Sequence, residues 1–74
     1  MSIKYAVIFE QAATNWGAYV PDLPGCITTG RTFDEAQKNI AEAIKGHIET
    51  LQEFGDPVPP PTSRAGEVEI TVAA

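Results

Sequence analysis

The chain has 74 residues, 43% of them apolar, and its ten carboxylates against five Lys and Arg side chains produce a net charge of -5. This balance excludes a surface that grips nucleic-acid phosphates, because such a surface needs an excess of Lys and Arg. No apolar run approaches the ~20 residues that cross a bilayer, and the one cysteine permits no internal disulfide. We therefore expect residues 1–74 to form a single cytoplasmic domain that binds neither nucleic acid nor a membrane.

Three strands are predicted in the first 30 residues. Ile3 to Glu10 is rich in β-branched and aromatic residues with apolar side chains at alternate positions. Trp16 to Val20 follows a polar connection, and a hairpin is the economical link between the two strands. The segment Pro21 to Gly25 then reverses the chain, because proline donates no ladder hydrogen bond and glycine accepts a positive φ. Cys26 to Thr29 is the third strand.

One helix is predicted after these strands. The run from Thr32 to Glu35 forms a capping box, in which the Thr32 hydroxyl accepts from the Glu35 amide and the Glu35 carboxylate accepts from the Thr32 amide. Apolar residues at helical spacing follow from Phe33 to Phe54, with charged residues opposite, so an amphipathic helix should lie on the sheet. It ends at Gly55. The helix spans roughly 33 Å and a seven-residue strand roughly 23 Å, so one end of the helix should overhang.

A fourth strand completes the predicted fold. Pro57 to Pro61 is a stiff connector, and Glu67 to Val72 alternates apolar and polar side chains. We expect an α+β fold of two layers in the order β-β-β-α-β, with a mixed four-stranded sheet of order 3-2-1-4 and the helix on one face. This arrangement resembles half of a ribonuclease H fold. The other face of the sheet carries apolar residues, which predicts a homodimer or higher homo-oligomer.

Two residues suggest chemistry. Cys26 and His47 form a conceivable nucleophile and base, but the sequence offers no third group to orient the histidine and no oxyanion motif. The acidic residues lack metal-ligand spacing, and Asp34 and Glu35 are explained by helix capping. We expect no catalytic residue, no metal and no cofactor. A small-molecule binder or minor enzyme with a pocket near Cys26 and His47 stays open as an alternative.

Several motifs point together to one family. They are Trp16, the run Ala18 to Cys26, Thr29-Gly30, Thr32, Asp34 to Ala36, Asn39, Glu42 to Ile44, His47, Gly55 and Pro57 to Pro61. From about Lys4 to Ser63 this pattern resembles the HicB-like antitoxin domain. The resemblance implies a non-enzymatic, oligomeric domain that binds and inhibits HicA, a small basic RNA-cleaving toxin.

Four residues in and around the turn are candidates for contact with the toxin. The turn Pro21 to Gly25 is rigid before binding, with Asp22 offering a carboxylate and Leu23 an apolar side chain that packs either on the core or into a partner. Tyr19 lies just before this turn. Arg31 stands where many relatives carry an acidic residue. We therefore predict partner contacts at Tyr19, Asp22, Leu23 and Arg31. Longer relatives append a DNA-binding module, and an operator-binding role is not expected for residues 1–74.

Overall fold

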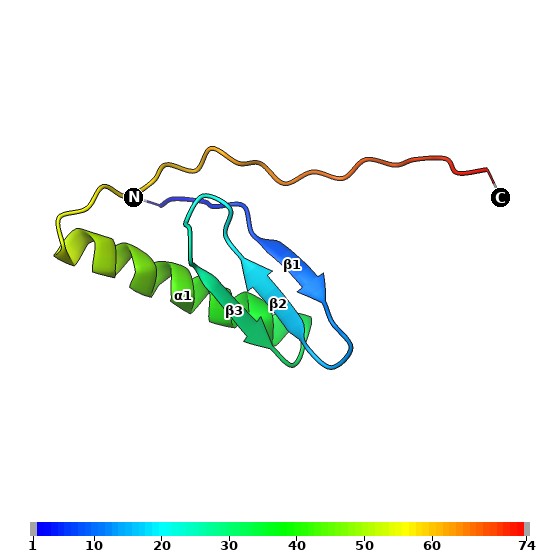
Figure 1. The fold of residues 1–74 in the computed structure, drawn as a ribbon, viewed down its shortest axis with the longest axis horizontal. Helices are drawn as coiled ribbons and strands as arrows, with labels where there is room; N and C mark the ends of the chain where they lie inside the picture. Colours follow the sequence, from blue (N-terminus) through cyan, green and yellow to red (C-terminus); the bar gives the residue numbers. More distant parts are fainter. Residues whose placement is uncertain (1, 74) are drawn as a thin grey trace.

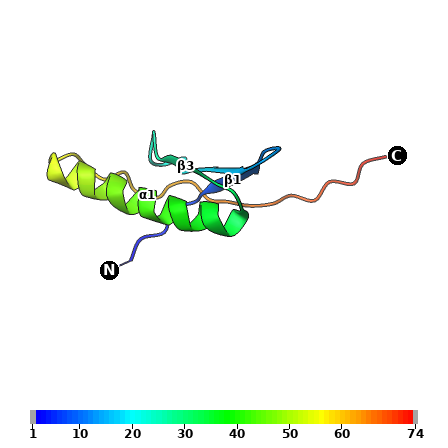
Figure 2. The same ribbon diagram turned by 90° about the horizontal axis from the view of Figure 1, so that it is seen from below.

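A computed structural model describes residues 2–73 and shows a three-stranded antiparallel sheet with one helix on one of its faces (Figure 1). The elements are β1 Ile8–Gln11, β2 Trp16–Tyr19, β3 Ile27–Gly30 and α1 Phe33–Glu53. The strand order is β1-β2-β3, and α1 packs mainly against β2 and β3. Seen from below, sheet and helix form two layers (Figure 2). In the part of the chain that the structure describes, no helix is long and apolar enough to cross a membrane.

The helix begins where its cap was predicted. Thr32 has extended backbone angles, and its Oγ1 accepts the Glu35 amide at 3.1 Å. The Glu35 carboxylate returns to the amide of Arg31 at 3.2 Å, not to that of Thr32 as predicted. The reciprocal bond therefore closes one residue earlier. Its effect is the same, because both bonds satisfy amides at the helix start.

Gly30 allows β3 to run directly into α1. A Cβ atom at this position would lie 2.7 Å from the Cα of Ala36, so any side chain would collide with helix backbone. Ala36 itself is fully buried. The close approach of strand end and first helical turn thus depends on the absence of a side chain at Gly30.

The other end of α1 is a Schellman motif. Gly55 has a φ of 72°, its amide donates to Gln52, and the Asp56 amide donates to Leu51 at 2.8 Å. The C-terminal half of the helix extends beyond the sheet (Figure 1), as the length comparison predicted. Residues 2–3 and 58–61 lie beside this overhang, where they line a hollow together with Ile48 and Gln52.

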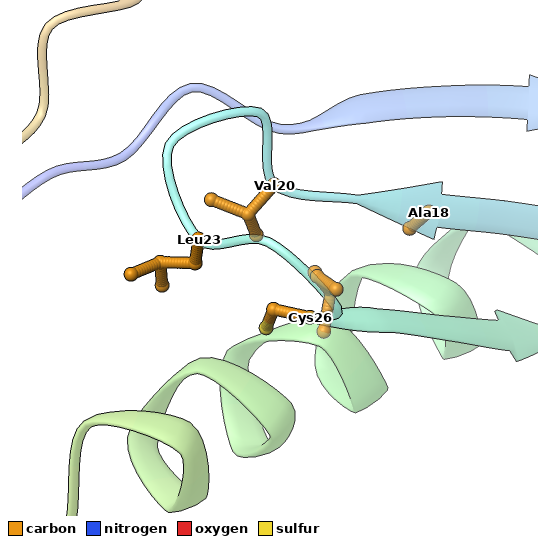
Figure 3. Packing of buried hydrophobic residues seen from close by; sticks show 5 residues of the cluster. Ala18, Val20, Leu23 and Cys26 are labelled. Carbon is orange, nitrogen blue, oxygen red and sulfur yellow. The ribbon is translucent and has the colours of Figure 1, made fainter. Parts of the chain in front are cut away.

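The core lies between the helix and the β2–β3 turn. Its buried cluster is Ala18, Val20, Leu23, Cys26 and Ile40. Figure 3 shows the members from β2 and the turn gathered above the helix. The half-buried side chains that pack around this cluster are Tyr5, Val7, Phe9, Ala43 and Ile44. The core is small, so single side chains in it contribute a large share of the stability.

The predicted four-stranded mixed sheet of order 3-2-1-4, and with it the likeness to half of a ribonuclease H fold, is wrong. The sheet has three strands, all antiparallel, and residues 67–72 pair with no strand in the described structure. Val68, Ile70 and Val72 are 82%, 70% and 80% exposed. The first strand is also shorter than predicted, since it begins at Ile8 rather than Ile3.

The physical reason is the way the proline-rich connector is held. The Tyr5 hydroxyl donates to the Pro59 carbonyl, and the Asp22 carboxylate binds Thr62 and Ser63. These bonds fix the connector beside the β2–β3 turn. The chain then leaves the domain as an extended tail that points away from the sheet (Figures 1 and 2).

Candidate functional site

The β2–β3 turn is closed by its own backbone. Leu23 donates to the Val20 carbonyl, Cys26 donates to the Leu23 carbonyl, and Val20 donates to the Cys26 carbonyl, all at 3.0 to 3.1 Å. Gly25 has a φ of 83°, which other residues resist. This geometry turns the Leu23 side chain inward, where it is 0% exposed. Of the two positions that the sequence left open for Leu23, the structure shows the one in the core.

Asp22 binds the chain's own C-terminal segment. Its Oδ2 accepts the amides of Thr62 and Ser63 at 2.9 and 2.8 Å, and its Oδ1 accepts their two hydroxyls at 3.0 and 2.8 Å. The bond from the Ser63 amide is the main reason that the pKa of the Asp22 carboxyl lies below its usual value. The partner role of Asp22 stays a prediction. Its bonds to Thr62 and Ser63, 40 and 41 residues away, were not predicted, because no local pattern marks them.

Tyr19 lies on the sheet face opposite the helix. Phe9 stacks on Phe33 of α1 with ring centroids 4.7 Å apart, which identifies the helix-facing side of β1. Phe9 pairs with Ala18 of β2, so Ala18 faces the helix as well. Because strand residues alternate between faces, Ile8 and Tyr19, which adjoin these two residues, point to the opposite face. Ile8, Tyr19 and Ile27 are paired in register on that other face.

We call Ile8, Tyr19 and Ile27 the open-face row. Tyr19 is 40% exposed and Ile27 is 69% exposed, while Ile8 is half-buried. A row of large apolar side chains across three strands, open to solvent, is the usual character of an interface. Ile27 was missed as a candidate, although its place beside buried Cys26 in an alternating strand would have put it on this face.

Arg31 lies at the opposite end of β3 from the turn. Its guanidinium is 3.4 Å from the Glu35 carboxylate, and its side chain is 88% exposed. The Arg31 amide and guanidinium together hold the pKa of Glu35 below its usual value. The four predicted partner residues therefore do not form one cluster: Tyr19 and Arg31 are exposed in different places, Asp22 binds the tail, and Leu23 fills the core.

Cys26 and His47 do lie in one hollow. It measures about 260 Å³ and lies between the start of β3 and the C-terminal half of α1. Its lining comprises Gly25, Cys26, Ile27, Ala43, Gly46, His47, Thr50 and Leu51, a set without a carboxylate. Burial raises the pKa of the Cys26 thiol, so the thiol is protonated at neutral pH and a poor nucleophile. Within residues 2–73 no cluster of His, Cys, Asp and Glu side chains is suited to holding a metal.

The chain is similar in sequence to a known protein family. Residues 5–70 match the family model described as the HicB_like antitoxin of bacterial toxin-antitoxin system. The UPF0150 protein Ta0767 of Thermoplasma acidophilum is 41% identical over 73 residues, which cover 97% of this chain and all of that protein. Antitoxin HicB 2 of Photorhabdus laumondii is 30% identical over 73 residues, which cover 99% of this chain and 52% of that protein.

Solved structures are similar as well. A chain of the HicA3 and HicB3 toxin-antitoxin complex superposes with a TM-score of 0.70 at 37% identity, covering 80% of this chain and 70% of that one. The N-terminal domain of the Burkholderia pseudomallei antitoxin HicB superposes with a TM-score of 0.61 at 36% identity, covering 92% of this chain and 69% of that one. These matches support a non-enzymatic, antitoxin role, and the chain belongs to the HicB-like antitoxin family of bacterial toxin–antitoxin systems.

Proposed function

We propose that this chain is a cytoplasmic antitoxin that binds a small, basic, HicA-like RNA-cleaving toxin and blocks its activity. The observation that carries the proposal is the likeness, at 37% identity, to a chain of a HicA3 and HicB3 complex. The net charge of -5 complements a basic partner. We also propose that residues 1–74 act as one domain and that the chain forms a homodimer or higher homo-oligomer.

The surface we propose for the toxin is the open-face row. An interface of this kind has an apolar centre in which tyrosine often contributes most of the binding energy. Tyr19 lies at the middle of the row, with Ile8 and Ile27 as its register partners. Glu10 lies two residues after Ile8 on the same strand, so it shares this face and offers a carboxylate to a basic partner.

The outer face of α1 has a different proposed role. The helix carries five carboxylates against two lysines, and Asp34, Glu42, Glu49 and Glu53 are exposed. Charges of one sign on an exposed face attract an oppositely charged partner at a distance, which raises the association rate more than the final affinity. We therefore assign steering to α1 and contact to the sheet.

The test measures binding to a HicA-like toxin and inhibition of its RNA cleavage. Tyr19→Ala should weaken binding at least tenfold, about 1.4 kcal/mol, with an unchanged far-UV circular dichroism spectrum. Phe54→Ala is the matched control, because Phe54 is an aromatic residue 73% exposed just after α1. Glu49→Lys should slow association and reduce its salt dependence. Full binding by Tyr19→Ala would refute the proposed surface, and no binding by the unmodified chain would refute the proposed function.

The alternative, a small-molecule binder at Cys26 and His47, is favoured by one observation, their shared hollow of about 260 Å³. The two proposals differ in what Cys26→Ser does. The antitoxin proposal expects toxin binding within twofold of the unmodified chain, since Cys26 is 3% exposed and lies off the open-face row. A small-molecule ligand that shifts the His47 ring signals in NMR and loses affinity in Cys26→Ser would support the alternative instead.

A further inference from the structure

Two segments of this chain have the composition of strands and no strand partner in the described structure. One is residues 3–7, which precede β1, and the other is residues 67–72 in the tail. The tail segment alternates Val68, Ile70 and Val72 with polar residues, and these three side chains are at least 70% exposed. Such an edge, open and apolar on one side, tends to pair with another strand.

The tail cannot pair along its own β1 in the direction in which it leaves. Ile8 faces Tyr19 in the ladder, so the β2–β3 turn lies at the Ile8 end of β1. Asp22 in that turn holds Ser63, which fixes the start of the tail there. Extended chain from Ser63 to Glu67 covers about 13 Å, whereas Ile8 to Gln11 covers about 10 Å. A straight tail has thus passed β1 before its strand-like segment begins.

The free edge of β1 matches the tail in chemistry. Phe9 in β1 and Tyr5 and Val7 just before it are half-buried, pack against the core, and lie at alternate positions along the chain. The helix packs mainly on β2 and β3, so it leaves these three side chains partly uncovered. A strand added beside β1, with Val68, Ile70 and Val72 on the helix side, would cover both apolar sets at once.

A second copy of the chain is the occupant that this geometry favours. The proline-rich connector 57–61 is stiff, and the next two residues, Thr62 and Ser63, bind Asp22, so the tail beyond them projects outward (Figure 1). If two copies related by a two-fold axis exchange their tails, the β1 edge of each copy gains a strand partner from the other. We propose that residues 67–72 of one chain form an edge strand on β1 of a second chain, reciprocally. This inference rests on the homo-oligomer part of the proposed function, for which it names the exchanged segment. It does not depend on toxin binding and leaves the open-face row free.

The first test uses charge on the two faces of the tail. Ile70→Asp should convert a dimer to a monomer in light scattering at micromolar concentration. Thr71→Asp is the matched control, because it adds the same charge one residue away on the outward face, and it should stay dimeric. Circular dichroism must show a folded helix in both. A monomeric unmodified chain, or a dimer that survives Ile70→Asp, would overturn the proposal.

The second test separates exchange from pairing within one chain. In a Cys26→Ala background, Val7→Cys and Ile70→Cys are made in separate chains, which are mixed and oxidised. Exchange predicts a disulfide-linked heterodimer of the two variants, in excess of either homodimer. If the chain carrying both substitutions closes its disulfide internally and the mixture forms no heterodimer, the tail pairs with its own sheet and the proposal is wrong. Toxin binding is not used, so failure here leaves the antitoxin proposal standing.

Discussion

Leu23→Ala tests whether this turn residue belongs to the core. Leu23 is 0% exposed and is the largest fully buried side chain among residues 2–73. Leu→Ala at such a site costs about 2–5 kcal/mol, since it removes the buried methyl groups and leaves a cavity. A 74-residue domain has a free energy of unfolding of about 4–11 kcal/mol. A loss of about 3 kcal/mol would lower Tm by roughly 12–24 °C.

The assay is urea unfolding followed by circular dichroism. Leu23→Met is the control, because it conserves volume and should cost less than about 1.5 kcal/mol. Ile27→Ala serves as a second control, since Ile27 is 69% exposed and its truncation should change stability little. The reasoning fails if Leu23→Ala lowers stability by less than about 1 kcal/mol. Unchanged stability together with lost toxin binding would show that Leu23 contacts the partner.

Three further predictions follow from single contacts. Gly30→Ala should lower the free energy of unfolding by about 1–3 kcal/mol, because the new Cβ atom meets the helix backbone. Gly17→Ala is the control and should be nearly neutral, because no atom lies within 4 Å of its added Cβ. Equal melting temperatures of the two variants would contradict this prediction. Thr32→Ala should cost about 1 kcal/mol through loss of the helix cap, and Thr32→Ser should restore it. Folding lowers the pKa of Asp22, so the bonds from its carboxylate to the tail stabilise the fold above the ordinary aspartate pKa of about 3.9, and this stabilisation is lost as the pH falls through the lowered value. The amide NMR signals of Thr62 and Ser63 should therefore move in that acid range. If they also move there in Asp22→Asn, Asp22 is not the group that titrates.

The sequence alone determined the elements whose causes are local. The cap at Thr32, the apolar stripe from Phe33 onward and the glycine at position 55 all act within a few residues, and the helix Phe33–Glu53 begins and ends where they predict. The reversal at Pro21 to Gly25 is equally local. The motif pattern also predicted the family, and the match of residues 5–70 to the family model confirms this prediction.

Only the tertiary structure decided where the last segment goes. The alternation of residues 67–72 predicts a strand, but the same pattern fits a strand in its own sheet, in another chain, or a solvated tail. The decision rests on Asp22 binding Thr62 and Ser63 and on Tyr5 binding Pro59, contacts between residues 40 to 54 positions apart. Periodicity describes which side chains share a face, whereas the partner of that face depends on long-range side-chain bonds that no local pattern encodes.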